Sequence, residues 1–242
     1  MSDFCCTFAA EMKELVAQIE DLDISNPVWE TLTLKERAEL CRNARVIEYE
    51  RNEVIFTDGE APLYVYMVLA GKVRLHKEGV GQKQILDLLK PYDIVGHRAI
   101  FAAEPFSAEC TAFEDCSVLA INKDYFQSLI ESNIHLCHIF LHHLSKSLAI
   151  ITNQTVNLTQ KHIRGRLSES LLTLLKHYGV DEDGATLSIY LSREDLANMS
   201  NMTTSNAIRT LSQFSQEGLI GVDGRKIRIL DEPGLRKVSR LG

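Results

Sequence analysis

The sequence contains no long apolar run and no secretory signal. No window approaches 18 uninterrupted apolar residues, about the length that crosses a membrane as a helix. The first residues acquire acidic side chains within a few positions, and they lack a basic start, an apolar run and a small-residue cleavage site. We therefore expect a cytoplasmic protein with no membrane segment.

The chain also lacks a compact cysteine group, an internal repeat and a uniform charge. The six cysteines are scattered, and in a cytoplasmic chain most are expected to be reduced and structural. The net charge of −7 argues weakly against nucleic acid as a partner. Residues 160–242 alone carry +2, however, and residues 1–159 carry −9. This asymmetry indicates separate functions for the two parts.

Hydrophobic periodicity divides the first half of the chain into helices followed by strands. Residues 11–20 and roughly 28–43 have a helical period, with Thr33 as an N-cap and Glu36 three positions later. From Val46 to about Ile121, short apolar or alternating runs are separated by glycines. This pattern predicts an antiparallel barrel or jelly roll.

The segment from Asn133 to about Leu158 contains neither glycine nor proline and has a 3.5-residue apolar repeat. A repeat of this length favours packing against a second copy of the same helix. A central helix buried within one chain is the alternative, but the polar residues on the other faces favour the homodimer. The predicted dimer interface comprises Ile134, Cys137, Leu141, Leu144, Leu148, Ile151, Thr155 and Leu158.

A helix, a strand and a hairpin are expected in the last third of the chain. Residues 166–178 form an apolar helix that ends at Gly179, and residues 186–190 form a short strand. Residues 218–230 contain two alternating runs joined through Asp223-Gly224, which is a strong hairpin signal.

Two helix starts lie between that strand and the hairpin. Ser192 with Asp195 forms a capping box, Thr203 with Asn206 forms a second N-cap, and Asn201 occupies a turn that needs a residue tolerating positive φ. Two short helices followed by a hairpin are the pattern of a winged helix-turn-helix, whose second helix presents its first residues to base edges. The residues expected to pack the two helices together are Leu196, Met199, Ala207, Ile208 and Leu211.

From about Pro27 to Leu230, the order of these parts resembles the CRP/FNR family (cyclic-AMP receptor protein / fumarate-nitrate regulator) of bacterial transcription factors. The supporting stretches are GEAPLYVYMVLAGKVRLHKEG, LKPYDIVGHRAIF, NLTQKHIRGRLSESLLTLL and LSREDLANMSNMTTSNAIRTLSQFSQEGLI. The resemblance implies an α+β fold: an effector-sensing jelly roll of the cyclic-nucleotide-binding type with N-terminal helices (1–130), a coiled-coil dimerisation helix (131–158) and a winged helix-turn-helix (159–242).

The resemblance also implies a mechanism and partners. Such proteins bind palindromic operators as homodimers, and ligation of the N-terminal domain reorients the two DNA-binding domains. The effector signal is then expected to cross the 133–158 helix and a hinge near Thr159–Arg164. The expected partners are double-stranded operator DNA, a second copy of the chain and RNA polymerase, and no catalysis is expected.

In that family, the reading helix often carries Arg or Val, then Glu, then Thr, with an Arg four residues after the Glu. Thr204, Ser205 and Asn206 occupy the first three positions here, and Arg209 matches the last. Ser205 has no carboxylate to accept from cytosine N4, so the operator is expected to depart from the commonest family half-site. Arg193 matches a phosphate-contacting position of the family. The two cations at the hairpin tip are expected either to contact phosphates as well or to lie on a solvated turn. The predicted DNA contacts are Arg193, Thr203, Thr204, Ser205, Asn206, Arg209, Arg225 and Lys226.

The cyclic-nucleotide pocket of the family has Gly-Glu, followed about ten residues later by Arg-Ser-Ala. Here Gly96 is kept, but His97 replaces the Glu and Phe106 replaces the Arg. A cyclic phosphate would therefore be buried without its main counter-charge, and one of two adenine-contacting hydroxyls becomes Ile151. Cyclic AMP is not the expected effector, although Arg98 is a nearby alternative cation. The predicted effector-pocket residues are Gly96, His97, Arg98, Phe106, Ser107 and Thr152.

Haem or another gas- or redox-responsive group is the next hypothesis for the effector. Exchanging Glu and Arg for His and Phe makes the pocket more apolar and adds a possible axial ligand. A thiol switch through Cys137 at the dimer axis ranks slightly lower. A structural, hydrogen-bonded histidine remains the alternative to any ligand role. The candidate axial ligands are His97, His76, Met67, His135, His138 and His142.

An iron–sulfur cluster is disfavoured, and no metal ligand set is assigned. The iron–sulfur branch of the family carries closely spaced N-terminal cysteines, whereas Cys5 and Cys6 are adjacent and have no third partner nearby. Cys110 and Cys116 remain available, but small buried thiols in strands are the preferred interpretation.

Two other classes of protein fit the jelly roll less well. A cupin-type enzyme needs two histidines one residue apart, and residues 46–121 contain only His76 and His97. A cyclic-nucleotide-binding regulatory subunit of a kinase or channel is disfavoured by the missing phosphate-binding arginine and by the predicted DNA-reading helix.

Overall fold

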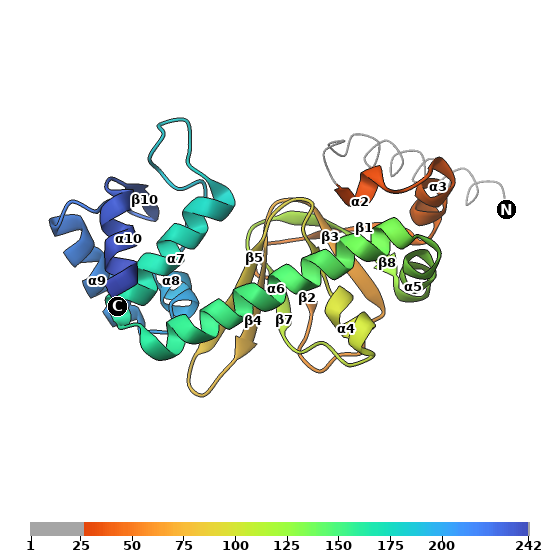
Figure 1. Ribbon diagram of the computed structural model, residues 1–242, viewed down its shortest axis with the longest axis horizontal. Helices are drawn as coiled ribbons and strands as arrows, with labels where there is room; N and C mark the ends of the chain where they lie inside the picture. The colour runs from red at the N-terminus through yellow and green to blue at the C-terminus, as the bar shows by residue number, and fades with distance from the viewer. Residues whose placement is uncertain (1–26, 242) are drawn as a thin grey trace. The chain divides into compact units, whose positions relative to one another are not determined.

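The computed structural model describes residues 27–241, so the helix expected at residues 11–20 lies outside the described part of the chain. The chain divides into two compact units. One comprises Leu86–Lys146 with the chain up to Lys77, and the other comprises Glu78–Ile85 with Ser147–Gly242. The long helix α6 (Ile134–Gln160) is continuous and contributes to both units (Figure 1).

In the part of the chain that the structure describes, eight strands form two four-stranded sheets with the orders β1-β8-β3-β6 and β2-β7-β4-β5. The β1–β8, β3–β8, β3–β6, β2–β7 and β4–β7 pairs are antiparallel, and the jelly roll predicted over residues 46–121 is confirmed. The strands are β1 (Ala44–Tyr49), β2 (Val54–Phe56), β3 (Tyr64–Ala70), β4 (Val73–Glu78), β5 (Lys83–Leu89), β6 (Ile94–Val95), β7 (Glu109–Ala112) and β8 (Cys116–Asn122).

The central strand β3 is buried on both of its faces. Tyr66 and Val68 belong to one apolar cluster together with side chains of both sheets, whereas Val65 and Met67 belong to a second cluster shared with the helices. Successive side chains of a strand point to opposite faces. This explains why β3 is a continuous apolar run in the sequence rather than an alternating one.

Among the described residues, four short helices accompany the sheets: α2 (Pro27–Glu30), α3 (Leu34–Arg42), α4 (His97–Ala102) and α5 (Lys123–Ser132). The helical period expected over residues 28–43 is divided between α2 and α3, because the helix is interrupted at residues 31–33. The predicted cap is confirmed: Thr33 caps α3, and its side chain and backbone form the capping box with Glu36. The sequence analysis did not predict α4 or α5.

The helix α6 extends two residues beyond the predicted repeat and leaves most of that repeat uncovered. Leu136 and Phe140 are its buried residues. The side chains of Ile134, Leu141 and Leu148 are 61%, 61% and 66% exposed.

By length and composition, α6 is the one helix of the described chain apolar enough to cross a membrane, which is weak evidence by itself. Its hydroxyl groups bond back to the carbonyl four residues earlier at Ser145, Thr152, Thr155 and Thr159.

The second unit contains α7 (Ile163–Tyr178), α8 (Arg193–Met199), α9 (Thr204–Gln216), the hairpin β9 (Ile220–Asp223) and β10 (Lys226–Ile229), and α10 (Glu232–Leu241) (Figure 1). The expected helix ending at Gly179 and the expected hairpin are confirmed. The strand expected at residues 186–190 is wrong, because only isolated bridges form at Thr186 and Leu187. The helix α10 was not predicted; it packs on α7, where the Ser168 hydroxyl donates to the Leu235 carbonyl at 2.6 Å.

Candidate DNA-binding surface and effector pocket

The sharp angle between α8 and α9 follows from local capping and one special backbone conformation. The Ser192 hydroxyl accepts from the Asp195 amide at 3.0 Å, and the Asp195 carboxylate accepts from the Ser192 amide. Thr203 caps α9 by accepting from the Asn206 amide at 3.3 Å. Asn201 has φ +48°, the left-handed conformation that the sequence analysis assigned to the turn. Both predicted helix starts are therefore confirmed.

Most of the residues expected to pack α8 against α9 do so. Leu196, Ala207 and Leu211 are at most 2% exposed. Ile208 contradicts the expectation, because its side chain is 48% exposed. The buried side of α9 repeats at Ala207, Leu211 and Phe214, and Ile208 lies about 100° around the helix from Ala207.

The opposite face of α9 is exposed and polar at its start. Thr204, Ser205 and Arg209 are all exposed. The Arg209 guanidinium donates from Nη2 to the Asn206 side-chain oxygen at 3.0 Å, so the arginine is held along its own helix. Hydroxyl groups and an arginine within about a turn and a half of a helix can contact phosphates and base edges together.

The hairpin tip is tied to the start of α8. Nη2 of Arg193 donates to the Gly224 carbonyl at 2.6 Å. Arg225 and Lys226 remain exposed, and Nζ of Lys226 lies 5.6 Å from the centroid of the Tyr190 ring. Arg193 therefore positions the wing, a structural role that the sequence analysis did not foresee, while two cations project from the wing turn.

A second link fixes α9 within its unit. Nη2 of Arg164 on α7 contacts the Glu217 carboxylate at 2.6 Å, and its guanidinium lies 5.0 Å over the Phe214 ring. This contact could not be predicted from the sequence, since Arg164 and Glu217 lie far apart along the chain.

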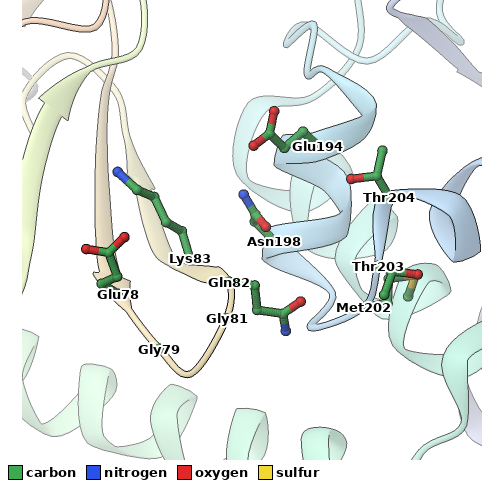
Figure 2. A pocket seen from close by; sticks show the side chains of 10 residues that line it. All are labelled: Glu78, Gly79, Gly81, Gln82, Lys83, Glu194, Asn198, Met202, Thr203 and Thr204. Carbon is green, nitrogen blue, oxygen red and sulfur yellow. The ribbon is translucent and has the colours of Figure 1, made fainter.

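A polar cleft of about 620 Å³ in the second unit borders the start of α9 (Figure 2). Beside it, the Gln82 amide donates to the Asn201 side-chain oxygen at 2.7 Å. Two carboxylates and one lysine line the cleft, so its charge does not suit a phosphate. The lining residues are Glu78, Gly79, Gly81, Gln82, Lys83, Glu194, Asn198, Met202, Thr203 and Thr204.

In the first unit, aromatic rings fill the region around Phe106. The Phe106 ring stacks on Phe56 with centroids 3.9 Å apart, and Phe56 stacks on Tyr66 at 5.6 Å. Gly96 has φ +91°, and a Cβ placed there would lie 3.3 Å from the Phe106 ring. A glycine is thus required at position 96 by the backbone conformation and by the nearby ring.

The His97 imidazole lies among a different set of rings. Its centroid is 5.3 Å from that of His143 and 5.5 Å from that of Phe140, both on α6, and 6.2 Å from that of Phe101. His97 is 3% exposed, and within the described residues neither ring nitrogen has a hydrogen-bond partner. Burial first, and then the charges that His143 and Arg98 can carry, lower the pKa of His97 to about 3. A polar interaction with the Ile94 backbone raises the pKa and so opposes this shift in part.

Comparison with known proteins identifies both parts of the chain. Residues 46–133 match the cyclic nucleotide-binding domain, and residues 165–238 match the Crp-like helix-turn-helix domain. The chain belongs to the CRP/FNR family of transcription regulators.

Relatives of this CRP/FNR-family protein include a CRP-like cAMP-activated global transcriptional regulator of Mycobacterium tuberculosis, which is 23% identical over 84% of this chain and 92% of its own. An anaerobic regulatory protein of Bacillus subtilis is 27% identical over 72% of this chain and 74% of its own. Among solved structures, FixK2 of Bradyrhizobium japonicum has the same fold, with a TM-score of 0.73 and 22% identity over 81% of this chain and 96% of that one.

In this CRP/FNR-family chain, the structure distributes the predicted pocket residues over several surroundings. Arg98 and Ser107 are exposed, and the Ser107 carbonyl accepts from Lys77 at 2.7 Å. Thr152 is exposed on α6 and donates to the Leu148 carbonyl at 2.9 Å. His97 and Phe106 are both buried, but their aromatic neighbours differ.

The other candidate axial ligands have surroundings that suit a cofactor less well. His76 is 2% exposed, and its Nε2 lies 3.0 Å from the Glu109 carboxylate, across the β4–β7 pair. Met67 is buried in the apolar cluster beneath the helices. His97 differs from His76 in that no carboxylate lies beside it and neither of its ring nitrogens has a hydrogen-bond partner among the described residues. The remaining three, His135, His138 and His142, are exposed on α6.

Four cysteines of the regulator lie among the described residues, and most of them are buried. Cys41, Cys110 and Cys116 are buried, and Cys137 is half-buried. Burial raises the pKa of the Cys110 thiol, and burial followed by nearby acidic residues raises that of Cys116 to about 11, which disfavours the thiolates that bind metal. Within residues 27–241, no group of three or more His, Cys, Asp or Glu side chains is placed to hold a metal ion.

Proposed function

We propose that this CRP/FNR-family chain binds a two-fold operator as a homodimer, with Arg209 of each α9 contacting a guanine. The observation that carries the proposal is the exposed polar start of α9, where Asn206 holds the Arg209 guanidinium at 3.0 Å. An arginine with its planar fork free on one side can contact guanine O6 and N7. The exposed cations Arg225 and Lys226 supply phosphate contacts from the wing.

Dimerisation is proposed to use the uncovered repeat of α6. Three leucine and isoleucine side chains at positions 134, 141 and 148 are more than 60% exposed in a single chain. These positions are seven residues apart and belong to the stripe of eight, spaced at alternate threes and fours, that packs against another such helix. Two copies of α9 would then face two half-sites, which is the reason to expect a palindromic operator.

The DNA contact is tested by titrating selected operator duplexes with the wild-type chain and with Arg209→Ala. Losing a bidentate contact to guanine should weaken operator binding by about 1–3 kcal/mol and relax the preference at that base pair. Arg240→Ala removes the same charge from the exposed surface of α10 and serves as the matched control. If Arg209→Ala keeps both affinity and base preference, the assigned contact is wrong.

Cyclic AMP is not the proposed effector. The position that would hold the phosphate-binding arginine carries Phe106, whose ring stacks on Phe56 at 3.9 Å. A buried phosphate without its guanidinium partner is strongly disfavoured. Isothermal calorimetry of the full chain with cyclic AMP should give no measurable heat of binding, and micromolar affinity would contradict the proposal.

A haem-type or small apolar effector is proposed to act through His97. Support comes from its buried imidazole, which has no hydrogen-bond partner among the described residues. The residues fit such a group only in part, because the rings of Phe140 and His143 lie within 5.5 Å of His97 and would have to separate around a porphyrin. When bound, haem would supply reversible binding of a diatomic gas or an electron.

The effector proposal is tested by anaerobic absorption spectra of the chain during haem addition. A Soret band that saturates at one haem per chain, and that is lost in His97→Ala but kept in His138→Ala, is expected for ligation by His97. Broad absorbance that never saturates would contradict haem and direct the search to apolar metabolites or to the Cys137 thiol.

The proposed location is the cytoplasm, and the proposed protein partner is RNA polymerase.

A further inference from the structure

One side chain on the proposed DNA-facing side of α9 is apolar and about half exposed. Ile208 is 48% exposed, although isoleucines of α-helices are commonly used in packing. A single exposed apolar residue needs no explanation in itself. Its position matters here because the exposed neighbours one turn before and one turn after it, Thr204, Ser205 and Ser212, are small hydroxyl residues.

The neighbours of Ile208 leave its methyl groups accessible. Residues three and four apart lie side by side on a helix, so Thr204 and Ser205 border Ile208 on one side and Ser212 borders it on the other. Arg209, the next residue, is directed toward Asn206 by a 3.0 Å hydrogen bond. An apolar patch with hydroxyl borders therefore lies beside the arginine proposed to contact guanine.

Only one group on a base-pair edge in the major groove is apolar. Thymine presents a C5-methyl group there, and apolar side chains contact it. Cytosine has only a hydrogen at C5, and its N4 amino group takes the place of the thymine O4 beside it. Covering that neighbouring donor with an isoleucine would leave it without a hydrogen bond. Ile208 thus favours thymine both by attraction and by excluding cytosine.

We infer that Ile208 is a specificity-determining residue, which contacts the C5-methyl group of a thymine next to the guanine contacted by Arg209. This inference rests on the proposed function and adds a second base to the predicted half-site. It also predicts that 5-methylcytosine is tolerated better than cytosine at that position, because it restores the methyl group.

The test begins with selection of duplexes from a random library by the full-length wild-type chain. Each thymine of the selected half-site is then replaced by uracil, which removes the methyl group and changes no hydrogen-bonding group. At one position, uracil should weaken wild-type binding by about three- to tenfold, on the scale of one or two buried methyl groups. Restoring a methyl group through 5-methylcytosine, in place of cytosine at that position, should recover a similar factor.

The decisive comparison uses Ile208→Ala with the same duplexes. The variant should fold, because the side chain is exposed and alanine favours helix. It should bind the thymine operator about as weakly as the wild type binds the uracil operator, and uracil should cost it little more. Leu230→Ala, which truncates another exposed apolar side chain of this unit, should retain the full effect of uracil.

Two results would overturn the inference while leaving operator binding intact. One is an operator whose thymines can all be replaced by uracil without loss of wild-type affinity. The other is an equal loss on uracil substitution in the wild type and Ile208→Ala. A selection that returns no two-fold site contradicts the proposed function itself, and the inference fails with it.

Discussion

The His97 side chain is an imidazole kept neutral by its surroundings. With a pKa lowered to about 3 in the folded chain and close to 6.5 when unfolded, it takes up a proton far more readily in the unfolded state. Its contribution to stability is therefore complete above about pH 6.5 and is lost as the pH falls toward 3. The groups facing it are Arg98 and His143, together with the rings of Phe101 and Phe140.

The first prediction is that His97→Leu reduces the acid sensitivity of the fold. Between pH 7 and pH 5, the wild type should lose about 2 kcal/mol more of its free energy of unfolding than the variant, because only the wild type carries this imidazole. Urea titrations of both proteins at the two pH values measure the difference. Parallel pH profiles would show that His97 is not buried as a neutral group.

At the residue scale, the sequence predicts positions where the side chain itself fixes the backbone. Thr33 and Ser192 were assigned correctly as caps, and Asn201 as the residue of positive φ, because each satisfies a local requirement. Ile208 was assigned wrongly to the packing face, since one residue of displacement along a helix changes the direction by about 100°. Arg193 could not be assigned to the Gly224 carbonyl, because that contact depends on the fold.

At the scale of single elements, the start of α8 depends on its capping box. Ser192→Ala removes the acceptor of the Asp195 amide and should lower the free energy of unfolding by about 1 kcal/mol. Ser192→Thr keeps a hydroxyl acceptor and should recover most of the loss. Denaturant titration measures both variants. Equal stability of Ser192→Ala and the wild type would mean that the cap contributes nothing to the fold.

Three short elements show where prediction from sequence stops. The helix α4 has only six residues, too few for a helical period to be distinguished from the surrounding strands. Residues 186–190 alternate like a strand, but the Asp183 carboxylate accepts from the Ala185 and Thr186 amides and holds the chain in a turn. The helix α10 has a polar, charged sequence with few apolar residues. Its formation could not be predicted because these residues are buried only by packing against α7.

At the scale of the whole molecule, the proposed dimer depends on one stripe of α6. Leu148→Glu places a charge on the exposed apolar stripe and should shift the protein to monomers, with a matching loss of operator affinity. Ala149→Glu adds the same charge one residue away, on an exposed position outside the stripe, and should leave the dimer intact. Sedimentation equilibrium of the three proteins measures the association. Identical association by all three would exclude this stripe as the interface.

The Thr155 hydroxyl donates to the Ile151 carbonyl at 2.9 Å, within its own helix. Thr155 is the one hydroxyl residue among the eight predicted interface positions, and its polar group is already satisfied before any second chain arrives. The methyl group of Thr155 is then the part of the side chain that contacts a neighbouring helix, as a methyl group of valine would. The eight predicted interface positions from Ile134 to Leu158 therefore form an apolar surface, although one of them is a threonine.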